Sequence, residues 1–148
     1  MVNKWLLIAA FVATVAISLH VYTFEVWIWP KFFKMPCTVD KCFPSFPFGG
    51  PKVVRGFYRT VWHFFTVNLL LTIIVNILVG IGTLVPYGML LIYFLIVFWI
   101  LIFVEIFFIG ALLLEPGDSY IRSMLRAFQW VFVGLIAFFM YLGTKYQV

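Results

Sequence analysis

The stretch that decides the fold class is YGMLLIYFLIVFWILIFVEIFFIGALLL, residues 87–114. A helix needs about 20 consecutive apolar residues to cross the hydrocarbon core of a bilayer. This stretch exceeds that length, and Glu105 is its one charged residue. Apolar side chains would occupy every side of such a helix, which is typical of a helix surrounded by lipid or by other helices. The stretch therefore predicts a transmembrane helix.

The rest of the chain has the same character. Hydrophobic residues make up 66% of the sequence and charged residues 10%, whereas soluble domains carry about 25% charged residues. Four apolar stretches predict helices over residues 5–29, 57–83, 87–114 and 120–143. Short connections make sequential helices antiparallel. We therefore expect residues 1–148 to form one integral membrane domain, an all-α antiparallel bundle of four transmembrane helices.

The first apolar stretch also has some features of a secretory signal, because Ala16 and Ser18 form a small-x-small site. The apolar core of a signal peptide is only about 7–15 residues long. Here the run continues past that site to Trp29. We therefore expect the first stretch to be retained as a helix.

Basic residues are concentrated at one side of the predicted bundle. They lie in or beside the two connections 30–56 and 115–119, as Lys31, Lys34, Lys41, Lys52, Arg55, Arg59, Arg122 and Arg126. Since Lys and Arg near helix ends stay cytoplasmic, both connections are predicted to face the cytoplasm, or the matrix or stroma of an organelle, with both termini opposite. Anionic lipid head groups are the expected partners of this face. Nucleic acid is not expected, because the basic residues alternate with apolar segments such as FPSFPFGGP.

The connection 30–56 is rich in phenylalanine and proline and holds both cysteines of the chain, Cys37 and Cys42. Two thiols are too few for a closed zinc site, which needs four ligands. They could form a disulfide in an oxidising compartment, whereas the predicted orientation favours free thiols. We expect this connection to lie in the membrane interface or against a partner, with its prolines preventing a helix.

Polar residues fall at two depths when residues are counted from the basic side at about 1.5 Å per helical residue. The deeper layer lies about 14 to 16 Å below that side and has one residue from each helix: His20, Asn68, Glu105 and Gln129. The shallower, ionic layer contains Glu25, Arg59, His63, Arg122 and Arg126. This arrangement predicts a bundle whose polarity is greatest toward the basic side.

Two interpretations of these layers stay open. An ionisable residue at the centre of a membrane helix costs about 2.5 to 3.5 kcal/mol to insert, so it suggests a function. Interhelical hydrogen bonds and an ion pair of Glu25 with Arg59 or Arg126 would instead hold the bundle together, each hydrogen bond contributing about 0.6 kcal/mol. Residues three or four apart share a helical face. His20 and Glu25 are five apart, so α-helical phase does not predict that they serve one site.

LHVYTFEVWIWP, residues 19–30, followed by RTVWHFFTV, residues 59–67, resembles a pattern of small uncharacterised four-helix membrane proteins. In that group a histidine and a glutamate mark the end of the first helix, and a Trp-His pair opens the second. The resemblance extends to His20, Glu25, Trp62 and His63, while the long connection 30–56 departs from it. It implies the four-helix fold and no particular activity.

Three functions are compatible with these features. The first is a non-catalytic accessory subunit of a larger respiratory or photosynthetic membrane complex, with Glu105 contacting another chain. The second is a redox protein in which His20 and His63 bind haem b or line a quinone site, since bundle cores are usual cofactor sites. The third is a small dimeric proton-coupled transporter using Glu25 or Glu105. No motif of hydrolytic or phosphoryl-transfer catalysis is present in the sequence, so we assign no catalytic or metal-binding residues.

Overall fold

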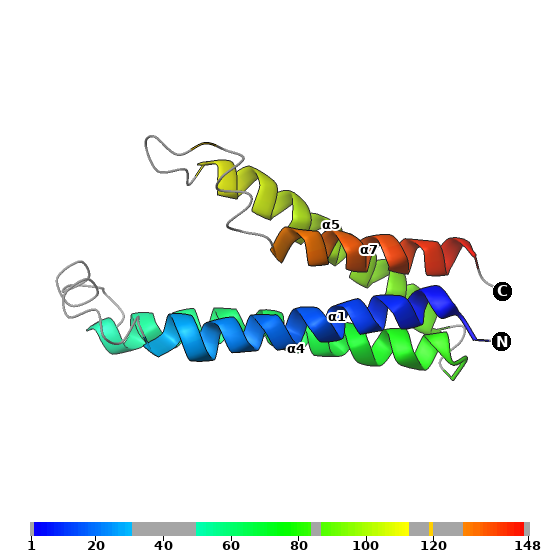
Figure 1. Cartoon of the computed structure of the whole chain (residues 1–148), viewed down its shortest axis with the longest axis horizontal. Helices are drawn as coiled ribbons and strands as arrows, with labels where there is room; N and C mark the ends of the chain where they lie inside the picture. Colours follow the sequence, from blue (N-terminus) through cyan, green and yellow to red (C-terminus); the bar gives the residue numbers. More distant parts are fainter. Residues whose placement is uncertain (1, 31–49, 84–86, 113–118, 120–128, 147–148) are drawn as a thin grey trace. The chain divides into compact units, whose positions relative to one another are not determined.

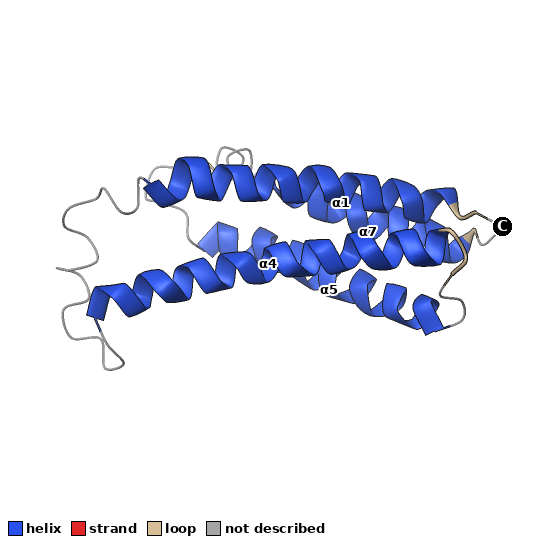
Figure 2. Cartoon of the chain, turned by 90° about the horizontal axis from the view of Figure 1, so that it is seen from below, coloured by secondary structure: helices blue, strands red, loops and turns tan. Residues whose placement is uncertain are grey.

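The computed structural model describes residues 2–30, 50–83, 87–112, 119 and 129–146, and most of these residues are helical. The elements are α1 (Lys4–Tyr22), the π-helix η1 (Thr23–Ile28), α4 (Gly50–Gly80), α5 (Tyr87–Leu112) and α7 (Gln129–Lys145) (Figures 1 and 2). Among these residues there is no β-strand. The predicted all-α class is therefore confirmed.

Three of the helices are long and apolar enough to cross a membrane: Lys4–Trp27, Arg59–Gly80 and Tyr87–Ile106. The fourth apolar helix, Trp130–Lys145, is shorter than a typical span over its described length. The prediction began this helix at residue 120, and residues 120–128 lie outside the described part of the chain. The structure thus supports three candidate spans and a fourth apolar helix.

The start of α4 differs from the prediction. The helix begins at Gly50, seven residues before the predicted start at residue 57. Pro51 was expected to prevent a helix, but it occupies the first turn of α4. Proline is accepted there, because the first N–H groups of a helix have no intrahelical partner and the ring presets a helical φ.

The end of α4 is set by a glycine. Gly82 has a φ of 84°, its N–H donates to Val79, and the N–H of Thr83 donates to Leu78. This pair of bonds is a Schellman motif, in which a residue with positive φ lets the chain return and satisfy the last carbonyls. The helix therefore stops at Gly80, three residues before the predicted end.

The chain forms two compact units. The first comprises residues Met1–Ala16 and Leu71–Val148, and the second comprises Ile17–Leu70. In the first unit α5 packs against α7. Its largest fully buried side chains are those of Leu6, Thr72, Asn76, Ile92, Trp99, Ile136 and Met140.

Asn3 joins three helix ends of the first unit. Its backbone N–H donates to the carbonyl of Gly80 at 2.7 Å, and its side-chain Nδ2 donates to the carbonyl of Gly143, also at 2.7 Å. Its Oδ1 accepts from the backbone N–H of Leu6 at 3.4 Å, within the first turn of α1. The start of α1 and the ends of α4 and α7 therefore lie together in this unit.

Two buried polar residues of α4 face the same unit. Thr72 and Asn76 are both 0% exposed, and Trp99 Nε1 of α5 donates to Thr72 Oγ1 at 2.9 Å. Asn76 Nδ2 donates to the carbonyl of Thr72 at 2.8 Å. Asn76 Oδ1 has no hydrogen-bond partner in the described structure. The bond from Trp99 to Thr72 therefore links α5 to α4.

Candidate functional site

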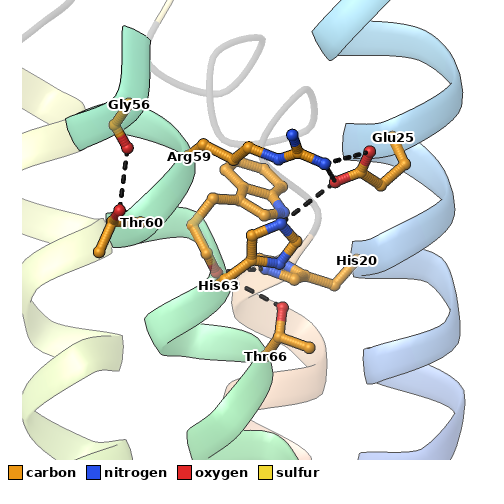
Figure 3. Close-up of polar contacts among 8 residues, drawn as sticks. His20, Glu25, Gly56, Arg59, Thr60, His63 and Thr66 are labelled. Carbon is orange, nitrogen blue, oxygen red and sulfur yellow. Dashed lines mark hydrogen bonds and ion pairs between the residues drawn. The ribbon is translucent and has the colours of Figure 1, made fainter. Parts of the chain in front are cut away.

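A cluster of charged and aromatic side chains lies in the second unit, where η1 faces the beginning of α4 (Figure 3). Glu25 is its centre. Both carboxylate oxygens lie 3.4 Å from Nη2 of Arg59, and Oε1 lies 3.1 Å from Nε2 of His63. These three side chains are between 31% and 48% exposed, so the ion pair of Glu25 and Arg59 is solvated and weak in stability terms.

Arg59 also contacts an aromatic ring. Its guanidinium carbon lies 5.0 Å from the ring centroid of Trp29, a cation–π contact. The head group of Arg59 therefore contacts both a carboxylate and an indole ring, from Glu25 in η1 and from Trp29 directly after it. This contact orients Arg59 more firmly than the single ion pair would.

His20 lies deeper in the cluster and contacts Trp62 in two ways. Its Nε2 is 3.2 Å from the backbone carbonyl oxygen of Trp62. The two rings are stacked, with centroids 4.3 Å apart and planes inclined by 11°. The same carbonyl accepts a long bond of 3.5 Å from Thr66 Oγ1, one turn further along α4.

Trp62 also stacks against Phe24, with ring centroids 4.6 Å apart and planes inclined by 18°. Phe24 is 5% exposed and is nearly perpendicular to the His63 ring, with ring centroids 6.0 Å apart. The indole Nε1 of Trp62 is buried and has no hydrogen-bond partner in the described structure. An unpaired buried donor carries a desolvation cost, so the aromatic packing around Trp62 has to offset it.

The π-helix η1 contains Glu25 and begins shortly after His20, which lies in the last turn of α1. In a π-helix hydrogen bonds join residues five apart, and the N–H of Trp29 bonds to the carbonyl of Phe24 in this way. Residues five apart are thereby brought toward one face, which a continuous α-helix would not do. The α-helical phase rule placed His20 and Glu25 on different sides, and the structure places both against α4.

The other predicted site residues are placed separately. Asn68 is partly buried, and its Nδ2 donates to the carbonyl of Phe64 on its own helix at 2.8 Å. Glu105 is exposed on α5, in the other unit. The remaining positions fall outside the described residues or side chains: Cys37, Cys42, Arg122, Arg126 and Gln129. The deeper polar layer stays a prediction.

The cofactor hypothesis for the two histidines meets a specific obstacle. The Nε2 atoms of His20 and His63, the usual haem-ligating atoms, contact a backbone carbonyl and a carboxylate respectively. Haem ligation through Nε2 would require both contacts to break. Within the described residues, no group of three or more His, Cys, Asp and Glu side chains is placed to hold a metal ion.

Comparison with protein-family models, curated proteins and solved structures finds no match to this chain. The function is therefore inferred from the contacts and the exposure of the described residues. Sequence reasoning missed the roles of Phe24 and Trp29, which shape the cluster through ring contacts. The available signal was their position in the aromatic segment 24–29.

Proposed function

We propose that this chain is a small integral membrane protein that acts as a non-catalytic subunit of a larger membrane complex, docking through the face of α5 that carries Glu105. The observation that carries this proposal is the exposed Glu105 side chain on an otherwise apolar helix. We propose a respiratory or photosynthetic complex as the larger assembly.

The surroundings of Glu105 make lipid an unfavourable neighbour. Val104 is 42% exposed and Leu101 is 61% exposed, so the carboxylate projects from an apolar surface. Glu105 makes no ion pair or hydrogen bond with the described part of the chain. A charged side chain within the bilayer costs about 2.5 to 3.5 kcal/mol on insertion scales. A basic or hydrogen-bonding group of another chain would remove this cost.

The apolar surface of α5 is also extensive. Beside Leu101 and Val104, the exposed residues include Leu90, Tyr93, Phe94, Val97 and Ile100. Lipid tails can cover such residues, but they provide neither a hydrogen-bond donor nor a positive charge for a carboxylate. A partner helix that packs beside Glu105 therefore explains both features of the surface, whereas lipid alone explains only its apolar part.

Glu105→Leu tests the assembly role. The tagged chain is extracted from its own membrane in a mild detergent and separated by native electrophoresis. We expect the wild type to migrate in a complex, Glu105→Leu to migrate as the free chain, and Phe138→Leu, which changes an exposed residue of α7, to stay in the complex. A wild-type chain that migrates alone, or a complex unaffected by Glu105→Leu, would refute the proposal.

The sidedness is proposed from charge alone, with the segment 30–56 on the cytoplasmic, matrix or stromal side. Cys37 and Cys42 are the two cysteines of the chain, so they report the location of this segment directly. The samples are first treated with a reductant, so that a disulfide cannot prevent labelling. A membrane-impermeant maleimide should then label the cysteines only after the membrane is opened. Labelling of reduced, intact cells would reverse the orientation.

A further inference from the structure

We propose that His20 accepts a hydrogen bond, through its Nδ1 atom, from the hydroxyl group of a membrane-soluble phenol or hydroquinone. The residues that carry this inference all belong to the second unit. Glu105 belongs to the first, so binding at His20 and docking through α5 can succeed or fail independently.

The contact with Trp62 fixes which imidazole nitrogen carries the proton. His20 Nε2 lies 3.2 Å from the carbonyl oxygen of Trp62, and a carbonyl oxygen can only accept a hydrogen bond. Nε2 therefore carries the hydrogen. In a neutral imidazole the other nitrogen is then an acceptor with a free lone pair. No hydrogen bond to Nδ1 of His20 is found within the described structure.

The charges around His20 favour the neutral ring. Glu25 contacts Arg59 and His63 instead of His20, so its negative charge is already engaged. The neighbours of His20 are the rings of Trp62 and Phe65, at centroid distances of 4.3 Å and 6.3 Å. An imidazolium without a carboxylate partner would be costly in such apolar surroundings. Nδ1 is consequently an acceptor that needs a donor.

The surroundings also indicate the class of donor. Phe65 presents an aromatic ring beside His20, whereas the Trp62 ring is already stacked against His20 and Phe24. Aromatic rings pack favourably against other rings in offset or edge-to-face geometry. A hydroxyl carried on an aromatic ring can therefore donate to Nδ1 and pack against Phe65, whereas the hydroxyl of a glycerolipid can only donate. His20 is partly exposed, so its ring is reachable from outside the chain. An apolar tail on the ligand would suit the exposed hydrophobic surface of the helices.

Nitrogen-15 NMR of the full chain tests the tautomer and the ligand together. The chain has two histidines, so labelling histidine alone gives two imidazoles, which the spectra of His20→Phe and His63→Phe assign. We expect His20 to be protonated at Nε2, and its Nδ1 resonance to shift when tetramethylhydroquinone is added in lipid nanodiscs. The dimethyl ether of the same compound has the same ring and no hydroxyl hydrogen, and should leave Nδ1 unshifted.

Affinity measurements give a second readout. Losing one hydrogen bond should weaken binding of tetramethylhydroquinone about five- to tenfold in His20→Phe. Phe94→Leu removes an exposed ring of α5 and should leave the affinity within about twofold. Three results would overturn the inference: a His20 protonated at Nδ1, equal shifts with the hydroquinone and its ether, or a haem band in the purified wild type that is lost in either histidine variant.

Discussion

The hydrogen bond between Trp99 and Thr72 offers the most direct test of the packing of α4 against α5. The donor–acceptor distance is 2.9 Å, and the two residues are 1% and 0% exposed. Thr72→Val removes the acceptor with little change of shape, and Trp99→Phe removes the donor. Interhelical hydrogen bonds of membrane proteins contribute about 0.6 kcal/mol on average and up to about 1.7 kcal/mol.

A double-mutant cycle measures the coupling energy between Thr72 and Trp99. Thr72→Val alone leaves a buried indole N–H without its partner, which costs about 1 to 3 kcal/mol. Once Trp99→Phe has removed that N–H, the same threonine change no longer leaves a donor unpaired. The double variant should therefore lose less stability than the sum of the single variants, by about 0.6 to 1.7 kcal/mol. Other contacts of Thr72 and the lost volume of the indole cancel in the cycle.

Steric trapping in lipid bicelles measures the free energy of unfolding of all four variants under one condition. Thr66→Val is the matched control, because its hydroxyl donates to the carbonyl of Trp62 within its own helix. Thr66→Val and Trp99→Phe should be additive within about 0.5 kcal/mol. A coupling energy near zero between Thr72→Val and Trp99→Phe would show that the interhelical bond is not formed and would refute the packing described.

Three further predictions use the same unfolding measurement. Gly143→Ala should destabilise the chain by about 1 to 3 kcal/mol, because its Cβ would lie 2.7 Å from Cγ of Leu6; Gly56→Ala, which meets nothing within 4 Å, should instead stabilise α4 by up to about 1 kcal/mol. Equal effects of the two alanines would contradict the close approach. Glu25→Gln should cost less than about 1 kcal/mol, since the ion pair it breaks is largely exposed, and a loss above about 2 kcal/mol would show a more buried cluster. Asn76→Leu should change the free energy by less than about 1.5 kcal/mol, because it removes a buried oxygen that has no described partner; a larger loss would reveal a partner for that oxygen.

The class of the fold could be predicted from the sequence because hydrophobic length is a strong signal. An apolar run as long as residues 87–114 predicts a helix long enough to cross a membrane, and the structure has α5 there. Helix ends were less predictable. Pro51 was expected to prevent a helix, although the first turn of a helix accepts proline. The sequence before Gly82 is apolar, so the apolar pattern did not indicate the turn that ends α4.

The cluster in the second unit could be predicted only in part. Basic and acidic residues near one predicted membrane face suggested that Glu25, Arg59 and His63 belong together, and the structure places them in contact. The approach of His20 to the same face of α4 could not be predicted from α-helical periodicity. A π-helix has no simple residue signature, and its wider turn is stabilised by the neighbours that it meets, here Trp62 above all.

The π-helix Thr23–Ile28 also sets the direction in which the side chains after it point. A π turn contains one more residue than an α turn, so it behaves as a one-residue insertion that the helix absorbs without a break. If the same residues were wound as a continuous α-helix, every side chain after the π-helix would turn by about 100°. Trp29 would then lose its place beside Arg59, although every residue of the cluster would still be present in the chain. The composition of the cluster and its assembly are thus specified separately, the first by side-chain identity and the second by the winding of the helix that carries it.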